Sequence, residues 1–310
     1  MSAEKLADRT PEEAATRAGY VLLAGLPNAG KSTLLNTLVG EHLSIVTAKA
    51  QTTWQRVAGI RTERNAQMIF LDTPGIIAAE QLLHRSMVAE AEWAGSEADV
   101  AIVVVDGAAR SAAAQRERLF DFVRRLRCPT VVAVNKSDHP RFNPGQGTVR
   151  DGHRETPALT VSAKKATGID ELLEFVRPHL PESPFLYPED HIATAPARFF
   201  VQELIRETVF EHFHQEIPYS VAVRVEEFRE SEDPVYIAAA LYAERKSQKG
   251  MLIGKRGTGI RVVGGDARRK IEHFLGRRVY LDLWVKVWDG WRRKKEGLMT
   301  FGYSVPDDVG

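Results

Sequence analysis

Residues Gly25 to Ser32 read GLPNAGKS, a phosphate-binding loop, and no other feature limits the fold of this chain so strongly. Such a loop needs a strand before it and a helix after it, because backbone N–H groups and the helix N-terminus together hold the phosphates. The apolar run Tyr20–Ala24 predicts the strand, and Lys31–Val39 predicts a helix that stops at Gly40. The sequence therefore predicts a nucleoside triphosphate site in an α/β domain.

The loop and the first helical turn supply the first set of candidate site residues. Lys31 is expected to reach the β- and γ-phosphates and to act in catalysis, and the Ser32 hydroxyl is expected to hold Mg²⁺. The candidate nucleotide contacts here are Gly25, Leu26, Pro27, Asn28, Ala29, Gly30, Lys31, Ser32 and Thr33.

A second motif, Asn135-Lys136-Ser137-Asp138, specifies the base. It follows the short apolar strand Thr130–Val134, and ligands of open α/β sheets bind at the carboxyl ends of the strands. Guanine presents two adjacent N–H donors, N1 and N2, which one carboxylate such as that of Asp138 accepts together. Adenine lacks both donors and would leave the carboxylate unpaired. The expected nucleotide is therefore GTP, or GDP after hydrolysis, with Asn135, Lys136 and Asp138 as contacts.

A third motif, Asp72-Thr73-Pro74-Gly75, follows the predicted strand Met68–Leu71. A carboxylate at that strand end, Asp72, is expected to hold Mg²⁺ through water. The Gly75 amide is expected to face the γ-phosphate, as a catalytic contact. Thr73, Pro74 and the next residue, Ile76, complete the candidate nucleotide contacts of this motif.

Alternating strands and helices predict a doubly wound sheet over residues 19–180. Further strands are expected at Val100–Val105 and Leu159–Val161, and helices at Ala113–Leu126 and Asp170–Leu180. Residues 1–18 are polar and are expected to form a disordered tail. Residues 181–196 carry four prolines and are expected to form a linker.

Residues 197–310 predict a second domain, of the α+β type II KH class. A helix is expected at Arg198–Phe213, and strands at Tyr219–Val225, Val235–Tyr242 and Val279–Val287. Between the last two strands lies a GxxG loop, Gly254 to Gly257, followed by a basic helix that ends near Gly276. Such a loop between helices holds the backbone of a single nucleic acid strand. The candidate RNA contacts are Lys249, Gly254, Lys255, Arg256, Gly257 and Arg261.

The charge distribution supports a polyanionic partner for this second domain. The stretch from Arg245 to Lys295 contains sixteen Lys and Arg against four Asp and Glu, although the whole chain carries a net charge of only +1. A basic stretch on an acidic body is typical of a region that meets a nucleic acid.

The chain resembles the Era-like GTPases from Gly19 to about Tyr303. The resembling segments are Lys49–Thr53 (KAQTT), DTPG, NKSD, Ser162-Ala163-Lys164 after Val161, Pro188–Asp190 (PED), Ile217–Val221 (IPYSV), IGKRG, and Leu283–Val287 (LWVKV) with Gly290-Trp291. The resemblance implies a slow GTPase that binds the 3′ end of small-subunit (16S) ribosomal RNA and acts in assembly of that subunit. It further implies that Thr53 completes Mg²⁺ coordination and acts in catalysis, that the Ala163 amide meets guanine O6, flanked by Ser162 and Lys164, and that Lys136 lies along the base.

Three residues, Ile76, Asn28 and Trp54, bear on hydrolysis or on the resemblance to the family. Ile76 stands where Ras-like GTPases carry the glutamine that orients the attacking water, so that device is absent. Asn28 lies where potassium-activated relatives place an ion ligand, so K⁺ is a candidate cofactor in addition to Mg²⁺. The alternative is that the Asn28 amide only stabilises the loop. Trp54 stands where the family has an arginine.

Two other functions compete with a GTPase switch in ribosome assembly. One is an RNA-binding protein in which GTP is a structural ligand. The other is a GTPase of the tRNA-modification type, whose relatives end in a reactive cysteine motif; the single cysteine here, Cys128, lies in the GTPase domain. The composition and the lack of a long apolar run predict a cytoplasmic monomer, with peripheral association with the inner face of the cell membrane left open.

Overall fold

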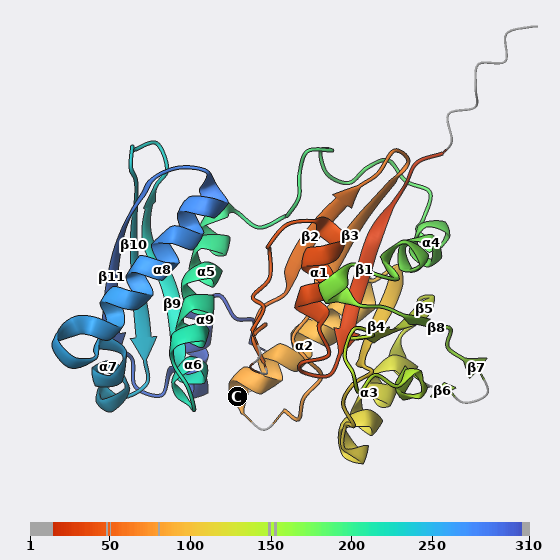
Figure 1. The fold of residues 1–310 in the computed structure, drawn as a ribbon, viewed down its shortest axis with the longest axis horizontal. Helices are drawn as coiled ribbons and strands as arrows, with labels where there is room; N and C mark the ends of the chain where they lie inside the picture. The colour runs from red at the N-terminus through yellow and green to blue at the C-terminus, as the bar shows by residue number, and fades with distance from the viewer. Residues whose placement is uncertain are drawn as a thin grey trace, which may run out of the picture.

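The chain folds into two domains, each built on its own sheet and set side by side (Figure 1). The structure is a computed structural model that describes residues 15–47, 49, 51–79, 81–147, 150–151 and 154–305. Most of the predicted N-terminal tail, residues 1–14, lies outside the described residues. Among the described helices, none is long and apolar enough to cross a membrane.

The first domain contains a six-stranded sheet in the order β2-β3-β1-β4-β5-β8. The pair β2–β3 is antiparallel and the remaining pairs are parallel. The strands are β1 (Arg17–Gly25), β2 (Val57–Thr62), β3 (Ala66–Asp72), β4 (Val100–Asp106), β5 (Thr130–Asn135) and β8 (Ala158–Thr160); a separate small pair is β6 (Arg150–Asp151) and β7 (Arg154–Glu155).

Helices cover both faces of this sheet, as a doubly wound fold requires. Val21 and Leu23 of β1 pack with α1 (Lys31–Val39) and α4 (Ile169–His179). The alternate residues Leu22 and Ala24 pack with α2 (Leu82–Glu97) and α3 (Ala113–Arg125) on the other face. The predicted doubly wound sheet is confirmed, with β2 as an antiparallel edge strand that the sequence pattern did not indicate.

The first strand begins three residues earlier than predicted, at Arg17. Arg17 donates its backbone N–H to the Asn65 carbonyl at 2.9 Å, and its guanidinium donates to the Leu180 carbonyl at 2.6 Å and pairs with Glu182. Ala18 is buried in the sheet. Arg17 and Ala18 therefore belong to the first domain and not to the predicted tail, because these partners from distant segments fix them.

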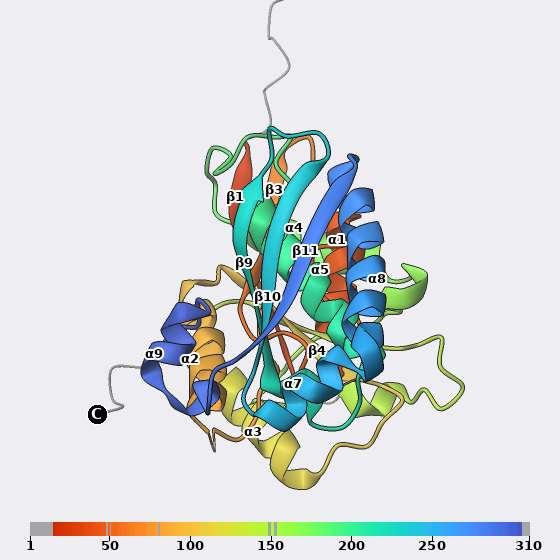
Figure 2. The ribbon, with the colours of Figure 1, turned by 90° about the vertical axis from the view of Figure 1, so that its left-hand side faces the viewer.

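The second domain is a three-stranded sheet in the order β11-β10-β9, with β10 parallel to β11 and antiparallel to β9. Its helix α5 lies between this sheet and the first domain, as Figures 1 and 2 show. The elements are α5 (Ala197–His212), α6 (Ile217–Ser220), β9 (Val221–Arg229), β10 (Val235–Ala243), α7 (Lys246–Ile253), α8 (Thr258–Leu275), β11 (Val279–Val287) and α9 (Lys295–Thr300).

One predicted strand of this domain starts later than expected. Tyr219 and Ser220 were predicted as the start of a strand, but they belong to the short helix α6. Pro218 stands in its first turn, where the fixed φ of proline suits a helix start and its missing N–H costs nothing.

The predicted linker, residues 181–196, has a fixed path along the edge of the first domain. The Ile60 amide donates to the Ile192 carbonyl at 2.8 Å, and the Thr194 amide donates to the Ala58 carbonyl at 3.3 Å. The buried side chain of Gln67 donates to the Tyr187 carbonyl and accepts from the Leu186 and Tyr187 amides. The segment thus covers the open edge of β2 and joins the two domains by a defined route.

Aromatic side chains from both domains meet in one cluster, here called the aromatic cluster. It contains Trp54 from the segment between α1 and β2, Phe210 from α5, and Trp291, Phe301 and Tyr303 from the C-terminal segment. The Trp54 ring lies 6.3 Å from that of Phe210, 6.1 Å from that of Trp291 and 6.0 Å from that of Tyr303. Since Trp54 is 3% exposed, the contact between the domains is closely packed at this point.

Candidate nucleotide site and RNA-binding surface

The phosphate-binding loop lies at the carboxyl end of β1 and borders a cavity of about 340 Å³. The loop needs glycine at position 30, because φ is +98° there and a Cβ would lie 2.2 Å from Asn135 Nδ2. The cavity is lined by Pro27, Asn28, Gly30, Lys31, Ser32, Thr33, Ile45, Val46, Thr47, Gln51, Thr52, Thr53, Gly75 and Lys136. Predicted residues from three motifs therefore line one cavity. The segment between α1 and β2, here called switch I, forms the other wall of the cavity.

Lys31 begins α1, and its side chain turns back over the loop. Its Nζ donates to the carbonyls of Gly25 at 3.2 Å and Leu26 at 3.1 Å. Burial lowers the pKa of Lys31 to about 8, with Asp72 opposing that effect. An anion bound at the loop would favour the charged form, which is what a phosphate contact requires.

Ser32, Thr53 and Asp72 come together from α1, switch I and β3. The Ser32 hydroxyl donates to Asp72 Oδ2 at 2.7 Å and lies 2.9 Å from the Thr53 hydroxyl, which in turn is 3.3 Å from Asp72 Oδ2. The other carboxylate oxygen, Asp72 Oδ1, is buried and has no hydrogen-bond partner in the described part of the chain. Burial raises the pKa of Asp72, although Lys31 and the hydroxyls lower it. Three converging oxygen groups and one unsatisfied carboxylate oxygen fit a hard divalent cation such as Mg²⁺.

The residues after Asp72 divide between the cavity and the core. Gly75 lies against the phosphate-binding loop, since a Cβ there would be 2.8 Å from the Pro27 nitrogen. Thr73 is buried and donates to the Leu23 carbonyl at 2.9 Å, so its side chain supports the strand end. The Ile76 amide donates to the Gly25 carbonyl at 3.0 Å, and its side chain packs in the core. Ile76 therefore has no polar group that could orient water.

The Asn135–Asp138 motif is tied to the phosphate-binding loop by hydrogen bonds. Asn135 Nδ2 donates to the Ala29 carbonyl at 2.9 Å. Lys136 Nζ donates to the Asn28 carbonyl at 2.8 Å and to Asp106 Oδ2 at 2.6 Å. Both side chains hold the loop in place and close this side of the site.

The carboxylate of Asp138 is exposed. The Ser162 hydroxyl donates to its Oδ1 at 2.6 Å, and this hydrogen bond lowers the pKa of Asp138. Asp138 is therefore ionised at neutral pH. Ser162 thus orients the carboxylate, while Lys164 is exposed beside it.

The Ala163 amide, which is predicted to meet guanine O6, donates to Asn135 Oδ1 at 2.9 Å. Asn135 is 2% exposed, and its buried carbonyl oxygen needs a donor, which the Ala163 amide supplies.

The GxxG loop joins α7 and α8 on the second domain and is exposed. Gly254 and Gly257 have φ values of +70° and +78°, and Arg256 between them is also left-handed at +55°. Gly259 lets α7 and α8 approach each other closely, because a Cβ there would lie 2.6 Å from the Leu252 carbonyl oxygen. This glycine was not among the predicted site residues.

Four cations on and beside this loop are unpaired. Across the residues that the structure describes, the side chains of Lys249, Lys255, Arg256 and Arg261 have no ion pair or hydrogen bond, and all but Lys249 are exposed. Some other cations of the basic stretch are paired, as in Arg268–Glu272, Arg269–Asp266, Lys270–Glu207, Lys286–Glu226 and Arg292–Glu244. The GxxG loop therefore presents positive charge that no acidic side chain of the described residues offsets.

Comparisons with known proteins agree with this arrangement. A family described as 50S ribosome-binding GTPase matches residues 20–136, and a KH domain family matches residues 216–292. GTPase Era from Carboxydothermus hydrogenoformans is 39% identical over 93% of this chain and 98% of its own length. The chain belongs to the Era family of GTPases. Era from Halothermothrix orenii is 40% identical over 93% of this chain and 99% of its own length.

Solved Era structures have the same fold. A variant of Era from Aquifex aeolicus bound to GDP and AlF4⁻ has a TM-score of 0.84 at 35% identity, covering 94% of this chain and all of that one. An Era complex with MgGDPNP and nucleotides 1506–1542 of 16S ribosomal RNA has the same TM-score, identity and coverage. The predicted GTPase activity and the predicted pairing of a P-loop GTPase domain with a KH domain are thus confirmed for this Era-family chain.

Proposed function

We propose that this Era-family GTPase binds the 3′ end of 16S ribosomal RNA through its KH domain and assists maturation and assembly of the small ribosomal subunit. The observation that carries the proposal is the exposed GxxG loop with four unneutralised cations around it. Glycines let a phosphate backbone approach, and the cations meet its charge. The solved Era complex with that RNA supports the choice of partner.

We propose the following roles at the nucleotide site. Lys31 holds the β- and γ-phosphates, and the Gly75 amide contacts the γ-phosphate. Ser32 and Thr53 ligate Mg²⁺, with Asp72 acting through water. When bound, Mg²⁺ neutralises charge that develops on the phosphates. Asp138 accepts both guanine donors. The convergence of Ser32, Thr53 and Asp72 beside the loop supports these assignments.

K⁺ is a second proposed cofactor. Asn28 lies on the cavity wall, and Ile76 is buried in the core, so hydrolysis lacks the side chain that orients water in Ras-like GTPases. A monovalent cation beside Asn28 would offset the developing negative charge.

We further propose that the protein acts as a monomer in the cytoplasm. The charge asymmetry and the ribosomal partner support that location. Peripheral membrane contact would then depend on the same basic surface as RNA binding.

A double substitution tests the RNA-binding proposal. Lys255→Asp with Arg256→Asp removes two cations and adds two carboxylates at the loop, so affinity for an oligonucleotide matching the 16S 3′ end should collapse. The salt dependence of any residual binding should become shallower, because fewer counterions are released. Unstimulated GTP turnover should be unchanged. Arg278→Asp is a matched control, since this exposed residue of the same domain lies directly before β11 and not in the GxxG loop.

Retained RNA binding by the double variant would reject the KH assignment. The alternative in which GTP is only a structural ligand predicts no change in turnover when the RNA is added to the wild type. A rise in turnover on adding RNA would exclude that alternative.

A further inference from the structure

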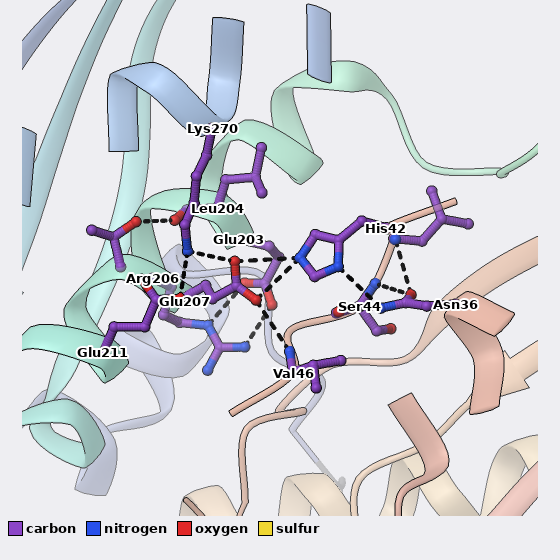
Figure 3. Close-up of polar contacts among 12 residues, drawn as sticks. Asn36, His42, Ser44, Val46, Glu203, Leu204, Arg206, Glu207, Glu211 and Lys270 are labelled. Atoms are coloured by element: carbon purple, nitrogen blue, oxygen red, sulfur yellow. Dashed lines mark hydrogen bonds and ion pairs between the residues drawn. The ribbon is translucent and has the colours of Figure 1, made fainter. Parts of the chain in front are cut away.

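An arginine of the KH domain, Arg206, contacts the switch I segment of the GTPase domain. Its Nη2 donates to the Thr52 carbonyl at 2.6 Å, across the boundary between the domains. Its Nε donates to Glu203 at 2.9 Å and Nη2 donates to the same carboxylate at 2.5 Å, which fixes the plane of the guanidinium. The side chain is 3% exposed. Figure 3 shows Arg206 and Glu203 on α5 facing switch I.

The same arginine also contacts the residue on the other side of Thr53. The guanidinium carbon lies 4.8 Å from the centre of the Trp54 ring, within the range of a cation–π interaction. Trp54 is held in the aromatic cluster, and its Nε1 donates to the Gln51 carbonyl at 2.8 Å. Both neighbours of Thr53 are therefore fixed by one side chain of the second domain.

Other contacts of α5 with switch I agree with this arrangement. Glu207 accepts from the Val46 amide at 3.1 Å and from His42 Nε2 at 3.1 Å (Figure 3). The ammonium of Lys49 donates to the carbonyls of Phe210 and Phe213 at the C-terminal end of α5. Switch I is thus bound to α5 at several points along its length, and the contact of Arg206 is with Thr52, a residue of the cavity wall.

We infer that Arg206 is a positioning residue for the GTPase reaction: it holds Thr52 and Trp54 so that the Thr53 hydroxyl lies beside Ser32 and Asp72. This inference rests on the proposed role of Thr53 at Mg²⁺. Switch I of GTPases is ordered by contacts with the γ-phosphate and Mg²⁺ and is released on hydrolysis. A residue that holds Thr53 in place should therefore favour nucleotides with a γ-phosphate over GDP. It also makes the GTPase site incomplete without the KH domain.

The test compares affinities for GDPNP and GDP, both with Mg²⁺, in the full-length protein. Arg206→Gln should leave GDP affinity within about twofold and weaken GDPNP affinity at least ~tenfold, the effect of losing a hydrogen bond from a charged donor. kcat for GTP should fall in parallel. Arg206→Lys should behave like Arg206→Gln, because one ammonium cannot replace the planar fork that serves both Glu203 and Thr52.

Arg198→Gln is the matched control. Arg198 lies on the same helix, but its guanidinium donates to the carbonyls of Val225 and Glu226 inside the KH domain. This variant should keep the wild-type ratio of GDPNP to GDP affinity. Equal loss of GDP and GDPNP binding in both Arg206 variants would show a general folding role and overturn the inference.

Thr53→Ala distinguishes a failure of this inference from a failure of the proposed role of Thr53, on which the inference rests. If Thr53→Ala keeps the wild-type ratio, the role of Thr53 is wrong, whatever Arg206 does. If Thr53→Ala loses the preference for GDPNP and Arg206→Gln does not, only the inference fails. If both hold, the double variant should be no worse than Thr53→Ala alone, because the two residues act through one contact. Additive losses would contradict the inference.

Discussion

Glu207 is a buried carboxylate between the two domains, and its replacement by glutamine should destabilise their contact. Its side chain is 5% exposed and accepts from His42, the Val46 amide and Lys270 Nζ at 2.8 Å. Burial alone would raise the pKa of Glu207, but the hydrogen bonds from His42 and Lys270 outweigh it and hold the pKa at about 2. Relative to an ordinary glutamate at 4.5, this corresponds to roughly 3 kcal/mol of stability at pH 7.

Glu207→Gln should therefore lower the free energy of unfolding by about 3 kcal/mol at pH 7. Urea denaturation followed by tryptophan fluorescence is a suitable assay, since Trp54 and Trp291 lie in the aromatic cluster between the domains. Because the folded pKa is depressed, the stabilisation is present above pH 4.5 and is lost as the pH falls toward 2. The difference between wild type and variant should shrink over the same range.

Glu211→Gln provides the matched control. Glu211 also accepts from Lys270, at 2.7 Å, but its side chain is 42% exposed. An exposed pair of this kind contributes at most ~1 kcal/mol. If Glu207→Gln proved as mild as Glu211→Gln, or if its effect did not depend on pH, the reasoning from buried charge would be refuted.

Three further measurements concern the base, a histidine and the monovalent ion. Asp138→Asn should weaken GTP binding at least ~tenfold and favour xanthosine triphosphate, whose 2-oxo group accepts from the new amide; unchanged GTP affinity would contradict the assignment. The hydrogen bond to Glu207 raises the pKa of His42; the charge of Glu211 acts in the same direction, whereas burial and Lys270 lower this pKa. Protonated His42 therefore stabilises the folded protein fully below pH 6.5, and this stabilisation is lost as the pH rises through the pKa of the folded state. His42→Gln should therefore flatten the pH dependence of unfolding above pH 6.5, and an unaltered profile would exclude this role. GTP turnover should be faster in K⁺ than in Na⁺, and equal rates would reject an ion at Asn28.

Local signals in the sequence were sufficient for two elements. The helix Lys31–Val39 was predicted with its observed bounds from the helical spacing of its leucines and from Gly40, which adopts a left-handed conformation at its end. Strand β11 was also predicted with its observed bounds, from alternation. Both depend on residues close together in the chain, so their pattern is visible without the fold.

Elements that depend on distant partners were missed. Strand β2 contains Gly59, which weakens a strand pattern, and it is fixed instead by pairing with β3 and by the linker.

The contact between the domains could not be predicted from the sequence for a different reason. In a helix such as α5, Arg206 and Glu207 look like residues of a solvated face, since charged side chains are rarely buried without partners. Their partners come from switch I and α8, far away in the chain. The one clue was Trp54, a large apolar residue that replaces the arginine of the family in a polar loop.

Because residues 181–196 are bound along the first domain, they limit the distance that the KH domain can move away from it. Among the described residues, the last hydrogen bond of this segment to the first domain is at Thr194, and α5 begins at Ala197. Two residues lie between these points, so the free tether spans only ~10 Å. If the contact with switch I opens, α5 stays at a local concentration of at least millimolar order. A contact between the domains that is too weak to join two separate proteins would therefore still form again readily after it opens.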